Sequence, residues 1–296
     1  MRKTRRRSTR DPRRTSGSVG RSRRRRWTLN LISGLVLTGA VILMSLVSFF
    51  YTPHSITKID IAGRFEPPNR VHLLGTDEYG RDTLSRIMVG SQTSLLVGIV
   101  AVGIAFVLGT LLGVLAGMAG AWVDEVIMRW MDILYAFPAV VLAILLVSVI
   151  GPGILSGMVA IGIASTPGFA RLARSGVLSI REEEYVQAAY AIGRSRWTAA
   201  WRHIVPNMAS TVVVQATIAF AGALLSEAGL SYLGLGVQPP IPSWGRMLKE
   251  AQTYMGIDAW LAIFPGVAIA LFVLGLYLLG DGIRQITDPR LIGTGD

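Results

Sequence analysis

SQTSLLVGIVAVGIAFVLGTLLGVLAGM, at residues 91–118, contains no charged residue and decides the fold class of this chain. A membrane-spanning helix needs about 20 consecutive apolar residues, so this run is long enough to cross a bilayer. Its glycines recur at short intervals, at Gly98, Gly103, Gly109, Gly113 and Gly117. Small residues at such intervals let helices approach closely in lipid. The run therefore predicts a membrane helix packed inside a helical bundle.

Other uncharged runs predict five more membrane helices, so we expect an all-α membrane protein with six transmembrane helices. These runs lie at residues 29–50, 133–170, 203–226 and 259–280. The run at 133–170 is too long for one span, and Gly151-Pro152-Gly153 divides it into two helices joined by a tight turn. Charged residues between 124 and 132 predict a short inner connection. With 51% hydrophobic residues and a mean hydropathy of +0.50, the chain is too apolar for an ordinary soluble domain.

Positive charge is concentrated at the start of the chain. The formal net charge is +11, and the first 26 residues hold 13 of the 29 Lys and Arg residues. A tract this polar buries too little apolar surface to offset the conformational entropy lost on folding, so we expect residues 1–26 to form a disordered tail. The first transmembrane helix is expected at 27–50. Basic flanks stay in the cytoplasm, which places both termini there after six spans. Attraction of the tail to anionic lipid stays open, whereas nucleic-acid binding is not favoured.

A polar segment at 51–90 is expected outside the membrane. Within it, HLLGTDEYGRDTLSR at 72–86 combines two glycines with helix-capping residue types, which predicts a compact, self-bonded loop leading into a helix. Its carboxylates do not follow the spacing of a Ca²⁺-binding loop. The three histidines, His54, His72 and His203, lie far apart in the sequence, at or outside the ends of the spans. We therefore expect no metal site.

The charged stretch at 181–206, REEEYVQAAYAIGRSRWTAAWRHIVP, is a helical interruption between apolar runs. Together with Arg171 and Arg174 just before it, its arginines predict a cytoplasmic loop. It contains no nucleophile beside a base and no metal-ligand spacing, and the chain has no cysteine and no Walker A motif. We therefore expect no catalytic residue and no cofactor bound by this chain. The stretch is interpreted as the place that receives mechanical work from a partner.

Three motifs resemble the signatures of ABC-importer permeases of the dipeptide/oligopeptide/nickel class, and most closely the C-type member of the permease pair. They are HLLGTDEYGRDTLSR (72–86), LSYLGLGVQPPIPSWGRML (230–248) and GDGIRQITDPRL (280–291). The resemblance covers about residues 29–292 and implies a type I ABC-importer permease bundle in the bacterial cytoplasmic (inner) membrane. It also implies a five-helix permease core at 91–292, with a cytoplasmic coupling loop at 176–206 and an outer loop at 230–258.

The same family carries a cytoplasmic E-A-A-x-x-x-G motif with a downstream I-x-x-P. Here the motif runs from Gln187 to Gly193 and is followed by Ile204-Val205-Pro206, so Gln187 stands where the family has Glu. Small residues would keep one helix face thin enough to seat on an ATPase, and the glycine would let the chain leave the helix sharply. The alternative is that they pack the loop against its own bundle. The residues that the resemblance assigns to ATPase coupling are Glu184, Gln187, Ala188, Ala189, Gly193, Arg194 and Pro206.

Two more sets of residues carry expectations on the outer side. The extracytoplasmic motif is either a docking surface for a binding protein or a scaffold of the outer loop; it comprises Gly75, Thr76, Asp77, Gly80, Arg81 and Asp82. The Gly/Pro-rich segment is interpreted as an outer gate or re-entrant turn, with Trp244 as an anchor at the membrane interface and Glu227 as a structurally paired charge. The outer gate candidates are Glu227, Gly234, Gly236, Pro239 and Trp244.

The resemblance also implies partners and a transported solute. We expect a second homologous permease subunit, two cytoplasmic ABC ATPase subunits or one fused ATPase that bind ATP and Mg, and an extracytoplasmic solute-binding protein. Membrane lipid is a further partner. Peptides are the expected solute, with nickel chelates, haem or glutathione as alternatives. A stand-alone channel or carrier and an intramembrane enzyme are the competing classes of function.

Overall fold

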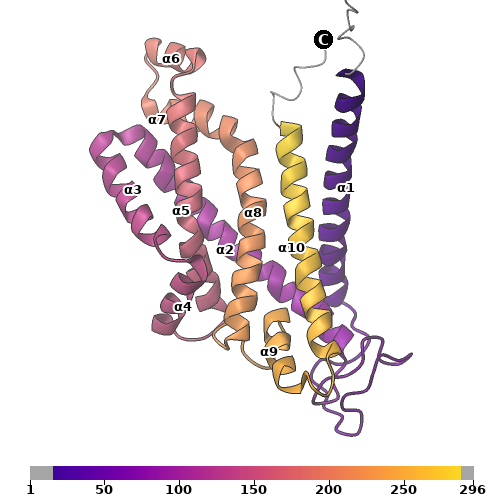
Figure 1. Cartoon of the computed structure of the whole chain (residues 1–296). Helices are drawn as coiled ribbons and strands as arrows, with labels where there is room; N and C mark the ends of the chain where they lie inside the picture. Colours follow the sequence, from indigo (N-terminus) through magenta and orange to yellow (C-terminus); the bar gives the residue numbers. More distant parts are fainter. Residues whose placement is uncertain (1–15, 288–296) are drawn as a thin grey trace, which may run out of the picture.

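The structure, a computed structural model, describes residues 16–287 (Figure 1). Within that range the chain is helical, and its one β-type contact is an isolated antiparallel bridge between Thr76 and Asp82. Residues 1–15 of the predicted tail and the end of the C-terminal motif, from residue 288 on, lie outside the described residues.

Six membrane crossings are present by length and composition if one bent helix pair counts as a single broken span. The prediction of six transmembrane segments is confirmed in this form. The five long helices are α1 (Ser16–Ser48), α2 (Thr83–Ala119), α5 (Ile154–Ile180), α8 (Val205–Tyr232) and α10 (Trp260–Thr287). The bent pair consists of α3 (Ala121–Tyr135) and α4 (Ala139–Ile150), which differ in direction by 91°.

Short elements gather at the two ends of the bundle (Figure 1). One end, called here the α6 end, carries α6 (Glu184–Ala191) and α7 (Arg196–Ala199), and a π-helical turn at Ala200–Ile204 joins α7 to α8. The opposite end, called the α9 end, carries α9 (Trp244–Tyr254) and the non-helical segment that follows α1. The described chain starts and finishes at the α6 end, as an even number of crossings requires.

The short inner connection predicted between residues 124 and 132 is wrong, because these residues form α3. Asp124 is paired with α5, since Arg174 Nη2 donates to Asp124 Oδ2 at 2.6 Å, whereas Glu125 and Arg129 are exposed and pair with each other. Pro138 lacks an N–H and disfavours a helical conformation in the residue before it, so α3 ends and the span bends there. The predicted tight turn at 151–153 does separate α4 from α5.

Two helices begin earlier than predicted. The first, α1, begins at Ser16, inside the tract predicted to be disordered. Extending an existing helix costs far less free energy than nucleating one, and arginine is a good helix former, so the membrane helix continues into this tract. The second, α2, begins at Thr83, inside the predicted outer segment, because Asp82 caps it by accepting a hydrogen bond from Ser85 N at 2.8 Å.

Glycines bring α2 directly against α5. A Cβ built on Gly113 would lie 2.3 Å from the carbonyl oxygen of Ala170, far closer than van der Waals contact. Gly109 and Gly117 meet α5 in the same way, one turn to either side. Gly103, by contrast, has no neighbour within 4 Å of an added Cβ in the described chain, so it takes no part in this contact. The main apolar core is built around this close helix contact.

Candidate functional site

The first part of the candidate site is the loop at the α6 end. Helix α6 stops because Gly193 takes a backbone φ of +82°, a left-handed conformation that strains any residue with a Cβ. Gly193 N donates to the carbonyl of Tyr190 at 3.0 Å, and Arg194 N donates to the carbonyl of Ala189 at 3.1 Å. These bonds satisfy the last carbonyls of the helix. The predicted role of Gly193 in a sharp helix exit is confirmed.

The small residues of α6 divide between two faces. Val186 is fully buried and Ala189 is 7% exposed, so this face packs on the chain's own bundle. Ala188, one residue earlier along the helix, is exposed, as are Glu184 and Gln187. The hypothesis that Ala189 lies on a free docking face is therefore wrong. Successive helical residues point about 100° apart, so two adjacent alanines cannot both face a partner squarely.

Gln187 contributes a hydrogen bond that the family's usual residue cannot make. Its side-chain Nε2 donates to the carbonyl of Arg181 at 2.8 Å, just past the end of α5. An ionised glutamate only accepts hydrogen bonds, so this contact depends on the amide. Gln187 thereby fastens α6 to the membrane helix that precedes it.

A cavity of about 540 Å³ lies between this loop and the α6 end of α2. Arg181 Nη1 crosses toward α2 and donates to the carbonyl of Gly117 at 3.1 Å. The loop is therefore tied to α2 as well as to α5. The cavity is lined by Gly117, Met118, Arg181, Glu182, Gln187, Tyr190, Arg194 and Arg196.

Exposed apolar side chains at this end were not among the predicted site residues. Ile192 is 78% exposed and Trp201 is 50% exposed, although both lie in a charged loop. An isolated apolar residue at the end of a polar helix was the signal available in the sequence. Pro206 lies exposed in the first turn of α8, where proline is tolerated because the N–H it lacks would have no intrahelical partner. We call Glu184, Gln187, Ala188, Ile192 and Gly193 the coupling face.

The extracytoplasmic motif forms a compact loop at the α9 end, as predicted. Asp77 Oδ1 accepts hydrogen bonds from the backbone N of Tyr79 at 2.8 Å and of Arg81 at 2.9 Å. Gly75 and Gly80 have backbone φ values of +72° and +73°, which turn the chain on both sides of Asp77. Thr76, Asp77 and Asp82 are all buried in the chain. Their burial favours the scaffold interpretation over docking through these side chains.

An ion network joins this loop to α2 and α9. Arg86, only 3% exposed, pairs with Asp77 and donates from Nη2 to Glu250 Oε2 at 2.7 Å. A buried charge is costly unless it is paired, and here three carboxylates meet three guanidinium groups. The network therefore requires the loop, α2 and α9 to be in place together. Its members are Asp77, Glu78, Arg81, Arg86, Arg246 and Glu250.

Within this network, the carboxyl of Glu78 has a raised pKa. Burial raises the pKa of Glu78 above its usual value, and the negative charge of Asp77 raises it further. The pairing with Arg81, at 3.2 Å between Nη2 and Glu78 Oε1, opposes these effects without cancelling them.

Among the outer gate candidates, Trp244 is not an interface anchor. Its side chain is fully buried, and Nε1 donates to the carbonyl of Ile87 at 3.0 Å. Gly90 makes room for the indole, since a Cβ there would lie 2.9 Å from the Trp244 ring. From sequence alone, an aromatic residue beside Gly and Pro residues is equally typical of a membrane interface and of a packed loop. Here it packs in the loop, because Gly90 on α2 leaves room for the indole.

The other gate candidates lie in the last turns of α8 and in the segment that follows it. Glu227 is buried, and its Oε1 accepts a hydrogen bond from Ser231 Oγ at 2.7 Å, which in turn accepts one from Val237 N at 3.0 Å. Gly234 has a φ of +83°, and Gly236 is buried against Ser231. Pro239 is exposed beside them. Pairing of Glu227 is therefore by hydrogen bond, and a gating role stays a hypothesis.

Comparisons with known proteins add the family context. The family described as binding-protein-dependent transport system inner membrane component matches residues 109–293. The chain is similar to a dipeptide transport system permease protein of Alkalihalophilus pseudofirmus, at 41% identity over 260 residues, 88% of this chain and 86% of the relative. It is 42% identical over 266 residues to a probable D,D-dipeptide transport system permease protein of Escherichia coli, covering 88% and 89% of the two chains.

A glutathione transport system permease protein of Pectobacterium atrosepticum is 45% identical over 226 residues, covering 76% of this chain and 75% of the relative. Among solved structures, an inward-facing conformation of the MetNI methionine ABC transporter contains a chain with a TM-score of 0.58 and 19% sequence identity. The match covers 68% of this chain and 96% of that chain. At this identity the likeness concerns the fold alone.

Proposed function

This chain belongs to the family of binding-protein-dependent transport system inner membrane components, and we propose that it is the C-type permease subunit of a peptide-importing ABC transporter. It is a multi-pass protein of the bacterial inner membrane with the type I ABC-importer permease fold. The observation that carries the proposal is that relatives about 40% identical over most of both chains are named dipeptide permeases.

In this proposal the α6 end faces the cytoplasm and the α9 end faces outward. The arginine-rich start of α1 and the arginines near α6 support this orientation, since basic flanks remain in the cytoplasm. A second, homologous permease completes the pathway. A solute-binding protein delivers the peptide at the α9 end.

The chain itself performs no catalysis in this proposal. Two ABC ATPase subunits, or one fused ATPase, bind ATP and Mg and dock on the coupling face. Movement of α6 then reaches the membrane helices through two contacts already described, Gln187 with the end of α5 and Arg181 with the end of α2. The bundle alternates between outward and inward access as the ATPases close and separate.

Reconstitution tests this function. The full chain, its partner permease, the ATPases and the binding protein are placed in lipid vesicles, and uptake of a labelled dipeptide is measured with ATP hydrolysis. We expect dipeptide to stimulate hydrolysis and to accumulate only when the ATPases and ATP are present. Uptake without ATPases would refute the permease assignment in favour of a channel or carrier. Uptake of glutathione but of no dipeptide would refute the peptide assignment alone.

A further inference from the structure

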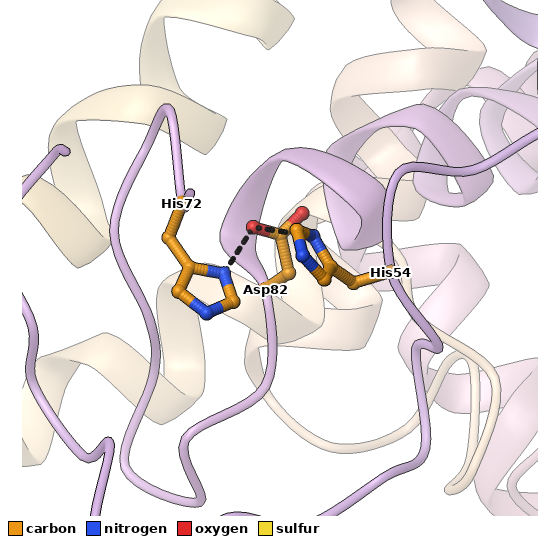
Figure 2. Close-up of side chains that lie close together, drawn as sticks. All are labelled: His54, His72 and Asp82. Atoms are coloured by element: carbon orange, nitrogen blue, oxygen red, sulfur yellow. Dashed lines mark hydrogen bonds and ion pairs between the residues drawn. The ribbon is translucent and has the colours of Figure 1, made fainter. Parts of the chain in front are cut away.

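Two histidines and an aspartate that are distant in sequence meet at the α9 end. Figure 2 shows His54 and His72 on either side of the Asp82 carboxylate. His72 Nδ1 lies 2.8 Å from Asp82 Oδ1, and His54 Nδ1 lies 3.6 Å from the same oxygen. The two imidazole rings have their centroids 4.5 Å apart. One ligand-type atom from each residue lies within 4.8 Å of the other two.

We propose that His54, His72 and Asp82 form a binding site for a divalent transition-metal ion of the Zn²⁺ type. Two imidazole nitrogens and a carboxylate oxygen are a donor set that suits zinc and disfavours Ca²⁺ or Mg²⁺. Ligands of a tetrahedral zinc ion lie about 2.0–2.2 Å from it and thus about 3.3 Å from one another. The observed separations of 2.8 and 3.6 Å lie on either side of that value. All three ligand atoms lie within 4.8 Å of one another, so the two rings would close around the ion on binding, and a water molecule would complete the coordination.

Hydrogen bonds behind the three side chains hold them in position. Asp82 Oδ2 accepts from Ser85 N at 2.8 Å and from Ser85 Oγ at 2.7 Å, which leaves Oδ1 directed at the histidines. The same Ser85 Oγ accepts the backbone N–H of His54 at 3.0 Å. His72 N donates to Asn69 Oδ1 at 2.7 Å within its own turn. Metal sites depend on such support for their ligands.

His54 makes only a long contact with Asp82, at 3.6 Å between Nδ1 and Oδ1. The hydrogen bond between His72 and Asp82 at the start of α2 is explained without a metal ion. His54 Nδ1, however, is buried and has no hydrogen-bond partner among the residues that the structure describes. A buried polar atom without a partner is unfavourable, and a metal ion would supply the missing contact. The side chains of His54 and His72 remain 36% and 20% exposed, so the site lies close to solvent.

A bound ion would fasten the outer segment at three points. His54 follows α1 closely, His72 lies on the turn before the extracytoplasmic motif, and Asp82 caps α2. The ion would therefore close the chain between α1 and α2, outside the membrane-spanning helices. This inference goes beyond the proposed transport function, because it concerns the stability of the outer segment and no step in the passage of solute.

The test uses the full-length chain in lipid nanodiscs, purified by an epitope tag that contains no histidine, and titrated with ZnCl₂ by calorimetry. We expect one zinc ion per chain. His54→Ala and His72→Ala should each weaken binding by at least about tenfold, since each removes a ligand. His203→Ala serves as the matched control, because it removes a histidine at the α6 end and should leave zinc affinity unchanged.

A second readout separates loss of the site from loss of the fold. Because binding to the native state stabilises it, zinc should raise the thermal unfolding temperature of the wild type and leave that of His54→Ala unchanged. His54→Gln, which keeps a polar side chain, serves if the alanine variant unfolds without metal. Equal zinc affinity in the wild type and the His54 variants, or no saturable binding below about 1 mM, would overturn the proposal.

Discussion

Gln187 shows how one amide changes the connections of a helix. Its Nε2 donates to the carbonyl of Arg181, and two acidic residues, Glu183 and Glu184, lie one turn earlier on the same helix face. A carboxylate at position 187 would lose the donated bond and face two like charges at helical spacing. The departure from the family motif is therefore compatible with the local structure, because the amide and the acidic residues suit one another.

We predict that Gln187→Glu loosens α6. Loss of one hydrogen bond, with added repulsion, should cost about 0.5–1.5 kcal/mol of local stability. Hydrogen exchange of the α6 amides measures this, and we expect roughly tenfold faster exchange. Gln252→Glu on α9 is the control, since the Gln252 side chain is exposed and makes no hydrogen bond within the described part of the chain. Unchanged exchange in Gln187→Glu would show that the Arg181 contact does not hold α6.

The two neighbouring alanines should respond differently to a large side chain. Ala188→Arg should leave the protein inserted and folded but abolish dipeptide-stimulated ATP hydrolysis, because Ala188 is on the exposed coupling face. Ala189→Arg should instead lower the yield of folded protein, because Ala189 packs on the bundle. Size-exclusion profiles and hydrolysis rates of both variants check this. Ala121→Arg, at an exposed position on α3, controls for the added charge; full coupling in Ala188→Arg would disprove the assignment.

Glu78 predicts a pH dependence of stability. Burial and the negative charge of Asp77 disfavour its ionised form and raise its pKa in the folded chain, so its contribution is favourable at low pH and lost as pH rises through the folded pKa. In Glu78→Gln this loss is absent. The unfolding temperature of the variant relative to wild type should therefore be higher at pH 8 than at pH 5. A constant difference at the two pH values would contradict the assigned cause.

At the scale of elements, the contact between α2 and α5 depends on glycines, which have no side chain to keep the helices apart. Hydrophobic attraction between helices is weak in lipid, so close packing supplies the stability, and glycines at one face of α2 allow it. The recurring glycines predicted that this helix packs closely inside a bundle, and the structure identifies α5 as the partner. The same pattern included Gly103, which faces open space, because spacing alone does not say which face meets a partner helix.

Gly113→Val should disrupt the interface, because its Cβ would meet the Ala170 carbonyl at 2.3 Å. Overpacking of this kind costs about 1–3 kcal/mol, so we expect a lower unfolding temperature and a reduced yield. Gly103→Val in the same helix is the matched control, since nothing lies within 4 Å of its added Cβ. Equal thermal stability of the two variants would show that the close contact is unimportant.

The pairing of Asp124 with Arg174 could not be predicted from local sequence. Asp124 was one of the charged residues that predicted a connection between spans. Its partner, Arg174, lies on α5 and reaches it only when the helices pack. In the same way, the meeting of His54 with His72 depends on the path of the outer segment and not on any spacing. Apolar runs and turn residues predicted the spans; contacts between distant segments required the structure.

At the scale of the whole molecule, orientation in the membrane is the main expectation to test. Deletion of residues 2–20 should leave the α6 end in the cytoplasm, because the arginines at 23–26 still flank the first span. Protease protection of tags placed after Tyr51 and at the chain end measures this in inverted and right-side-out vesicles. An inverted pattern would show that the deleted arginines set the topology.

One helix connects the two ends of the bundle without interruption. Near its start, α2 carries Arg86 in the ion network with Glu250, and near its end the carbonyl of Gly117 accepts the hydrogen bond from Arg181. A helix resists compression along its axis because every turn is hydrogen-bonded to the next. In the proposed transport cycle, a displacement of the coupling loop would therefore be transmitted along α2 to the ion network at the α9 end, because α2 is one continuous helix.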